Sequence, residues 1–68
     1  SYYDYLRITR LAPATGEEYY YQAGAFHYLG IESEAVTACQ KAISLGYRNF
    51  RSYRMLGKIL YRSDRFTR

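Results

Sequence analysis

The stretch from Thr15 to Gly30, TGEEYYYQAGAFHYLG, decides the fold because it carries both a helix start and a helix stop. At its start, the Thr15 hydroxyl can accept from first-turn backbone N–H groups while Glu18, three residues later, reaches back to the backbone, which is a capping box. At its end, Gly30 can adopt the left-handed conformation that commonly terminates a helix. The sequence therefore predicts a helix between these two residues.

Similar signals bound the segments on either side. A helix over residues 1–11 is expected to stop before Pro13, because proline cannot continue a helix. A third helix is expected to open at residue 32 or 33 and to run to Leu45, where Gly46 closes it as Gly30 closes the helix before.

Asn49 is a typical N-cap and predicts a fourth helix over residues 50–62. We expect residues 63–68 to form a non-helical end, with Phe66 in a loop. No alternating run rich in valine or isoleucine is present, which argues against any sheet. The sequence therefore predicts an all-α protein built of antiparallel helical hairpins.

The pattern of residues repeats after 34 positions. At this shift the N-cap residues align with each other, and apolar or small residues align with apolar or small residues. The aligned pairs are Thr15 with Asn49, Tyr19 with Tyr53, Ala23 with Gly57, Phe26 with Leu60, Tyr5 with Cys39, Ile8 with Ala42, and Leu11 with Leu45. We expect the apolar and small members of these pairs to pack between helices.

Tyr19, Gln22, Ala23 and Phe26 stand at the spacing W-x2-L-G-x2-Y, and the second helix of the same unit matches A-x3-F, followed by a further small residue, through Ala35, Cys39 and Ala42. A 34-residue, two-helix period with this spacing resembles the tetratricopeptide repeat (TPR) family. The resemblance departs at three positions: Ser1, Gln22 and Tyr47 stand where alanine, leucine and proline are usual.

The resemblance implies a single domain of hairpins stacked as a short right-handed solenoid, a fragment of a longer array. Residues 15–48 resemble one complete repeat, residues 1–14 the second helix of a preceding repeat, and residues 49–68 the first helix of a following one. Each hairpin of such an array needs a neighbour to bury its open face. We therefore expect exposed apolar ends that could support a homodimer.

Members of the family bind an extended peptide or a helix in a concave groove lined by first helices. The resemblance places Glu17, Tyr20, Gly24, His27 and Tyr28 in such a groove, followed by Arg51, Arg54, Lys58, Tyr61 and Arg62. Tyr20 and Tyr28, with Gly24 between them, could form a shallow aromatic trough, or could merely coat the helix.

The distribution of charge along the sequence supports the second set of these groove residues without reference to the family. Residues 47–68 hold seven basic residues and one acidic residue, whereas residues 1–46 hold three basic and five acidic residues. At about 100° per residue, Arg51, Arg54, Lys58, Arg62 and Arg65 share an arc roughly 80° wide. Such a stripe favours carboxylates or phosphates. It could also be a solvated face, or pair with acidic residues of an adjoining helix.

These observations bear on three classes of function. The residues favour a protein-interaction scaffold whose peptide or protein ligand is acidic. The alternative is an RNA-binding helical repeat that uses the basic segment, although Glu17 and the absence of basic residues in the first hairpin's groove argue against it. An enzyme is not expected, because the sequence shows no nucleophile–base pair and no glycine-rich phosphate loop.

Cofactors, metals and membranes are not expected either. His27 and Cys39 are the sole residues of their types, so neither a disulfide nor a zinc site is predicted within this sequence. No apolar run approaches the roughly 20 residues of a membrane span. A single cysteine fits a reducing compartment such as the cytoplasm, and fits an oxidising one almost as well. Cys39 is predicted to be a packing residue rather than a reactive thiol.

Overall fold

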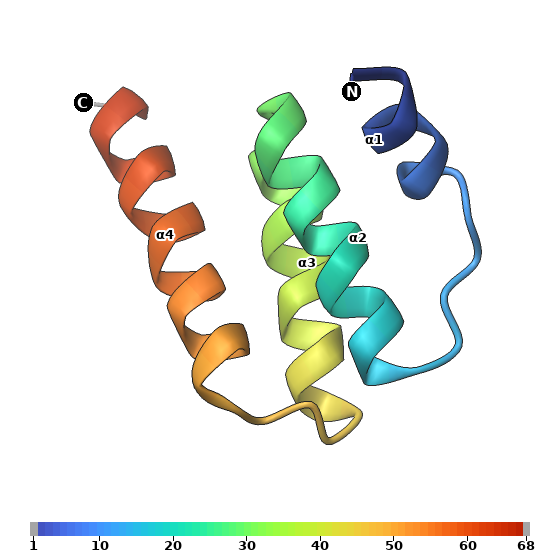
Figure 1. Ribbon diagram of the computed structural model, residues 1–68. Coiled ribbons are helices and arrows are strands. Elements are labelled where there is room, and N and C mark those ends of the chain that lie inside the picture. The colour runs from blue at the N-terminus through green and yellow to red at the C-terminus, as the bar shows by residue number, and fades with distance from the viewer. Residues whose placement is uncertain (1, 68) are drawn as a thin grey trace.

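The computed structural model describes residues 2–67, and the side chains of residues 2–62. Over this range the chain forms four helices and no strand, so the all-α prediction is confirmed. The helices are α1 (Tyr2–Thr9), α2 (Gly16–Leu29), α3 (Glu32–Ser44) and α4 (Phe50–Thr67). Figure 1 shows α2 and α3 as a central antiparallel hairpin with α1 and α4 on either side.

The predicted capping box at the start of α2 is confirmed. Thr15 Oγ1 accepts from the Glu18 N–H at 3.1 Å, and Glu18 Oε1 accepts from the N–H groups of Thr15 at 3.1 Å and Ala14 at 2.8 Å. These backbone donors stabilise the charged form, the Ala14 N–H most and Thr15 next, and lower the pKa of Glu18 below its ordinary value.

The two predicted glycine stops are also confirmed. Gly30 has φ of 80° and Gly46 has φ of 100°, a region that side chains strain to enter. After Gly30 the N–H of Ile31 donates to the Phe26 carbonyl at 2.9 Å, and after Gly46 the N–H of Tyr47 donates to Ala42 at 3.0 Å. These bonds satisfy carbonyls that the helix end leaves without partners.

Asn49 caps α4 as predicted, since its Oδ1 accepts from the N–H groups of Arg51 at 2.9 Å and Ser52 at 3.2 Å. The end of α4 was predicted wrongly. The helix continues to Thr67 instead of stopping at Arg62, so the backbone of Phe66 is helical and not in a loop. No glycine or proline follows Gly57, and nothing in residues 63–67 therefore interrupts the helix.

The other predicted boundaries need smaller corrections. α1 ends at Thr9 instead of Leu11, and the N–H groups of Arg10 and Leu11 close a tighter last turn onto Arg7 and Ile8. Residue 1 lies outside the described residues. α3 ends at Ser44, with Leu45 as its C-cap.

The core lies between α2, α3 and α4 and is made of small side chains. Ala23, Ala35, Ala38 and Cys39 are buried, with Ile59 of α4 the largest fully buried residue. Small side chains let the helix backbones approach closely, while the half-buried Tyr19, Phe26, Val36, Met55 and Leu56 fill the margins.

The junction of α3 with α4 is held by buried polar contacts as well as by Ile59. Ser52 is fully buried, and its hydroxyl donates to the Tyr47 carbonyl at 2.5 Å. Its own carbonyl accepts from the Cys39 thiol at 3.3 Å. These bonds satisfy the polar groups that burial removes from water, so they fix the start of α4 against α3.

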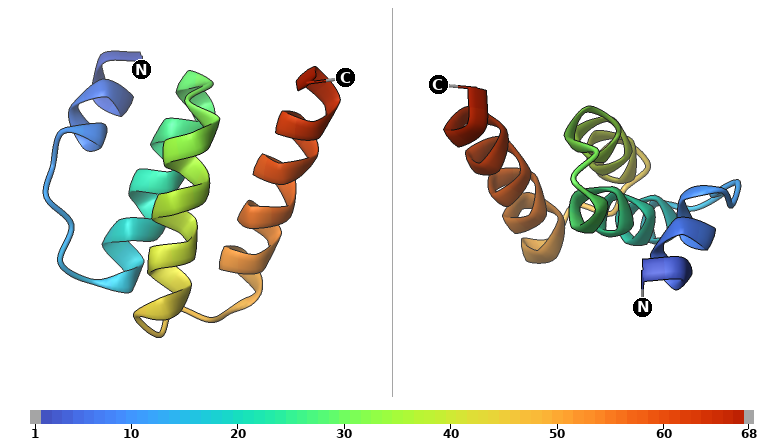
Figure 2. Two further views of the ribbon diagram at one scale, coloured as in Figure 1. Left: turned by 180° about the vertical axis from the view of Figure 1, so that it is seen from behind. Right: turned by 90° about the horizontal axis from the view of Figure 1, so that it is seen from above.

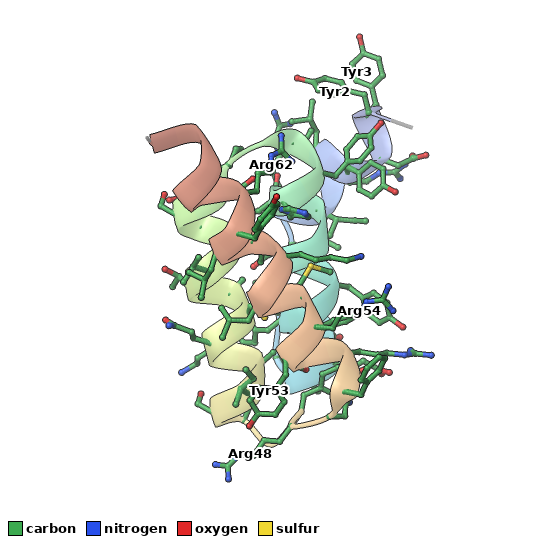
Figure 3. All side chains as sticks on the ribbon, turned by 90° about the vertical axis from the view of Figure 1, so that its left-hand side faces the viewer. Tyr2, Tyr3, Arg48, Tyr53, Arg54 and Arg62 are labelled. Atoms are coloured by element: carbon green, nitrogen blue, oxygen red, sulfur yellow. The ribbon has the colours of Figure 1, made fainter. Side chains whose placement is uncertain are left out.

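Five residues predicted to pack are instead exposed, namely Gly57 and four large apolar residues. Leu11, Leu45, Tyr53 and Leu60 keep 60%, 48%, 55% and 50% of their surfaces accessible. By helical geometry Tyr53 and Leu60 share a face of α4 that differs from that of the buried Ile59, and about half of each residue's surface stays accessible. Figure 3 shows Tyr53 projecting from the α3 side of α4 and Arg54 from the α2 side.

The outer helices attach to different members of the hairpin. α1 packs against α2, whereas α4 packs mainly against α3 and touches α2 less. The view from above in Figure 2 shows α1 and α4 on opposite sides of α2. This arrangement leaves one face of α2 open between two flanking helices.

Candidate functional site

The open face of α2 forms the floor of a large concavity. This concavity, which we call the aromatic groove, has a volume of about 710 Å³ and is bounded by α1 and the Leu11–Pro13 turn on one side and by Met55 and Arg62 of α4 on the other. No residue of α3 lines it. Its lining includes Tyr5, Tyr20, Tyr21, Gly24, His27 and Tyr28.

Two contacts hold α1 in place as the wall of the aromatic groove. The ring of Tyr5 stacks on that of Tyr28, with centroids 4.1 Å apart and planes inclined by 24°. The buried Gln22 amide donates to the carbonyls of Ile8 at 3.2 Å and Leu11 at 2.9 Å. Gln22 thus satisfies carbonyls at the end of α1, which explains why a polar residue occupies this otherwise apolar position.

A second concavity continues from the first along α4. This basic groove has a volume of about 380 Å³ and shares Tyr20, Tyr21 and Met55 with the aromatic groove. The rest of its lining is Phe50, Arg51, Arg54 and Lys58. The three basic side chains are exposed, and none forms an ion pair within the described residues.

The basic groove also combines charge with aromatic surface. The Arg54 guanidinium lies 5.8 Å from the centroid of the Phe50 ring, within the range of a cation–π contact. Among the side chains that the structure describes, no acidic one lines this groove. The local field therefore favours an anionic ligand, and the aromatic rings offer it apolar contact.

Arg62, the fourth basic residue of the predicted stripe, differs from the other three. Its Nη1 donates to the His27 carbonyl at 2.9 Å, and its Nε lies 3.4 Å from Oε1 of Glu32. His27 Nδ1 lies 3.3 Å from the other oxygen of the same carboxylate. Arg62 therefore joins α4 to the end of α2 and the start of α3, as its position in Figure 3 indicates.

Most of the predicted groove residues lie together in the structure. Tyr20, Gly24, His27, Tyr28 and Arg62 line the aromatic groove, and Arg51, Arg54 and Lys58 line the basic groove. Tyr61 lies in neither lining and is largely exposed, and Glu17 is likewise outside both. The Arg65 side chain, on which the predicted stripe was to end, lies outside the described side chains.

Sequence reasoning missed the wall that α1 contributes. Tyr5 and Ile8 were expected to pack, and Pro13 was interpreted as a helix stop, but all three line the aromatic groove. The sequence signal for this wall was Gln22, because a polar residue at an otherwise apolar position indicates a buried hydrogen-bond partner. The sequence did not identify that partner, because the carbonyls of Ile8 and Leu11 reach it only after α1 folds against α2.

Cys39 is buried, as predicted from its position in the repeat. Burial raises the pKa of its thiol, which keeps the sulfur protonated and poorly nucleophilic. Within the described residues, no group of three or more histidine, cysteine, aspartate or glutamate side chains could hold a metal ion. None of the helices in that part of the chain combines the length and apolar character of a bilayer span.

The geometry thus consists of an aromatic concavity and a basic concavity that meet on one face of the hairpin. No family model, curated protein or solved structure matches this chain.

Proposed function

We propose that this chain is a TPR-type helical-repeat segment that binds an acidic peptide or helix along the two adjoining grooves. The observation that supports this proposal most directly is that the basic groove places Arg51, Arg54 and Lys58 beside aromatic side chains, with no acidic side chain among the described residues of its lining. Recognition surfaces of proteins are enriched in tyrosine and arginine. In this proposal the 34-residue period supplies the solenoid-like stacking that creates the groove.

The geometry supports a peptide ligand better than RNA. Among the described side chains of the stripe, the unpaired basic residues are confined to the basic groove, since Arg62 already contacts Glu32. The larger adjoining groove is lined mainly by aromatic and aliphatic side chains. The affinity for a phosphate backbone rises with the number of phosphates that basic side chains neutralise, so a path with unpaired basic residues over only one of the two grooves gains less.

Selection from a random twelve-residue peptide library displayed on phage tests the proposed function. We expect enrichment of peptides rich in aspartate and glutamate on the wild-type protein, and loss of their binding to Arg54→Glu/Lys58→Glu. Arg10→Glu/Lys41→Glu is the matched control, because it makes the same change in net charge at exposed positions outside both grooves.

Three outcomes would contradict the proposal. Failure to enrich any peptide, or equal loss of binding in the control variant, would remove the groove as a specific peptide site. Binding of single-stranded poly-U RNA that falls steeply with added salt, together with no peptide enrichment, would favour the RNA alternative. Circular dichroism of each variant verifies that the helices are retained.

A further inference from the structure

The aromatic groove differs chemically from the basic groove that it adjoins. Its walls are Ile8, Leu11 and Pro13 on one side and Met55 on the other, above a floor that contains Tyr20 and Gly24. Its volume, about 710 Å³, lies within the roughly 300–1,000 Å³ of pockets that hold whole small ligands. It therefore has room for a large apolar group, and its lining favours burial of one.

The apolar wall is already in place in the free protein. The stacked rings of Tyr5 and Tyr28, and the bonds from Gln22 to the last carbonyls of α1, fix the position of α1 against α2. A group that enters a preformed pocket does not bear the entropic cost of ordering the wall.

The charges are distributed unequally along the two grooves. The unpaired cations Arg51, Arg54 and Lys58 lie around the first half of α4. Near the aromatic groove the only described cation of the stripe is Arg62, which is held by Glu32 and by the His27 carbonyl. A ligand carboxylate therefore gains most at the basic groove, whereas the aromatic groove favours an uncharged group.

From this juxtaposition we propose that the peptide ligand is bipartite, with one large apolar side chain inserted over α2 between α1 and α4, and acidic residues beside it that contact Arg51, Arg54 and Lys58. The inference rests on the proposed function and specifies its ligand. Tyr20, Tyr21 and Met55 line both grooves, so a single short peptide can occupy them together. The charge asymmetry then fixes which part of the peptide lies over which half of α4.

The library selection described above separates this inference from the proposed function. We expect the enriched peptides to share one phenylalanine, tryptophan, leucine or methionine next to a cluster of acidic residues. Enriched peptides that are acidic but have no common apolar position would overturn the inference and leave the proposed function intact. Failure to enrich any peptide would overturn both.

A pair of glycine variants tests the location of the apolar group. A Cβ at Gly24 would meet only the flexible Met55 Cε at 3.5 Å, so Gly24→Leu fills the aromatic groove without a backbone clash. Gly57→Leu is the matched control, because Gly57 lies within α4 with nothing inside 4 Å and lines neither groove. Both changes replace a helical glycine with a better helix former.

We expect Gly24→Leu to weaken an enriched peptide at least about tenfold, as loss of an interface anchor does, and Gly57→Leu to leave its affinity unchanged. Replacing the peptide's apolar residue with alanine should weaken binding to the wild type by a similar factor. The same replacement should have little further effect on Gly24→Leu, because the pocket is already filled. Additive losses would place the apolar residue elsewhere and overturn the inference.

Discussion

α2 and α4 carry the same pattern of residues 34 positions apart, but their equivalent faces have different surroundings. Ala23 of α2 is fully buried beneath α3, whereas its counterpart Gly57 is exposed with nothing inside 4 Å of where its Cβ would lie. Phe26 is half-buried against the core, whereas its counterpart Leu60 is half-exposed. A local pattern therefore specifies a face suited to packing, and burial of that face depends on whether another helix lies over it.

The α2–α3 hairpin and α4 are also held in place by different kinds of contact. The hairpin of α2 and α3 is held by small buried residues along its seam, by the capping box at the start of α2 and by the Gly30 turn between the two helices. α4 is attached mainly through Ile59, the buried bonds of Ser52 and the Arg62 contacts. Fewer residues thus hold α4 than hold the hairpin together, so we expect the loss of any one of them to lower the stability of that attachment by a larger share.

The largest effect is expected at the apolar contact of α4. Ile59→Ala removes the largest fully buried side chain and should lower the free energy of unfolding by about 3 kcal/mol, the usual cost of such a cavity. Leu60→Ala, on the exposed face beside it, should change it by less than about 0.5 kcal/mol. Urea denaturation followed by circular dichroism measures both.

A cost at Leu60 as large as that at Ile59 would show that the exposed face of α4 is covered in solution. Sedimentation velocity on the same samples would then distinguish the homodimer proposed from the sequence from a rearranged monomer. Equal costs in a monomer would contradict the packing of α4 described above.

Two glycines should respond in opposite directions to the same substitution. A Cβ at Gly16 would lie 2.9 Å from both the Ala42 carbonyl oxygen and the Tyr47 Cβ, so Gly16→Ala should destabilise the hairpin by about 2 kcal/mol. Gly57→Ala meets open space within a helix and should stabilise the protein by about 1 kcal/mol. Thermal unfolding measures the two shifts, and a gain at Gly16 would refute the close approach of α2 to the turn after α3.

The smallest expected effect is the pH dependence of the α2 cap. Because hydrogen bonds from Ala14 and Thr15 lower the pKa of Glu18, its contribution to stability is fully present above its ordinary pKa of 4.5 and is lost as the pH falls through the lowered value. Glu18→Gln should therefore differ most from the wild type near neutral pH, and the difference should shrink in acid. A difference in unfolding midpoint that is constant with pH would show that the carboxylate charge does not contribute.

Much of the local structure could be predicted because its causes lie within a few residues of each other. The capping box at Thr15, the left-handed Gly30 and Gly46, and the Asn49 cap depend on hydrogen bonds that span about one helical turn. The end of α4 was missed because residues 63–68 were expected to form a non-helical end with Phe66 in a loop, although they contain no glycine or proline that would break the helix.

The only parts of the candidate site that could be predicted are the sets of residues that share a face of one helix. Tyr20, Gly24 and Tyr28 share a face of α2 by helical geometry alone, and so do Arg51, Arg54 and Lys58 on α4. Two features of the site could not be predicted in this way: the stacking of Tyr5 on Tyr28, and the ion pair of Arg62 with Glu32. Both depend on contacts between residues far apart in the sequence.

The sequence by itself thus determined where the helices begin, where the first three end to within about two residues, and which residues share a face, because hydrogen-bond caps and the helical repeat act locally. Only the tertiary structure decided which of these faces are buried, since burial requires a second element. It placed α1 as a wall of the aromatic groove, paired Arg62 with Glu32, and left Tyr53 and Leu60 exposed. The two grooves exist because α1 and α4 flank α2, a relation that local residue patterns do not specify.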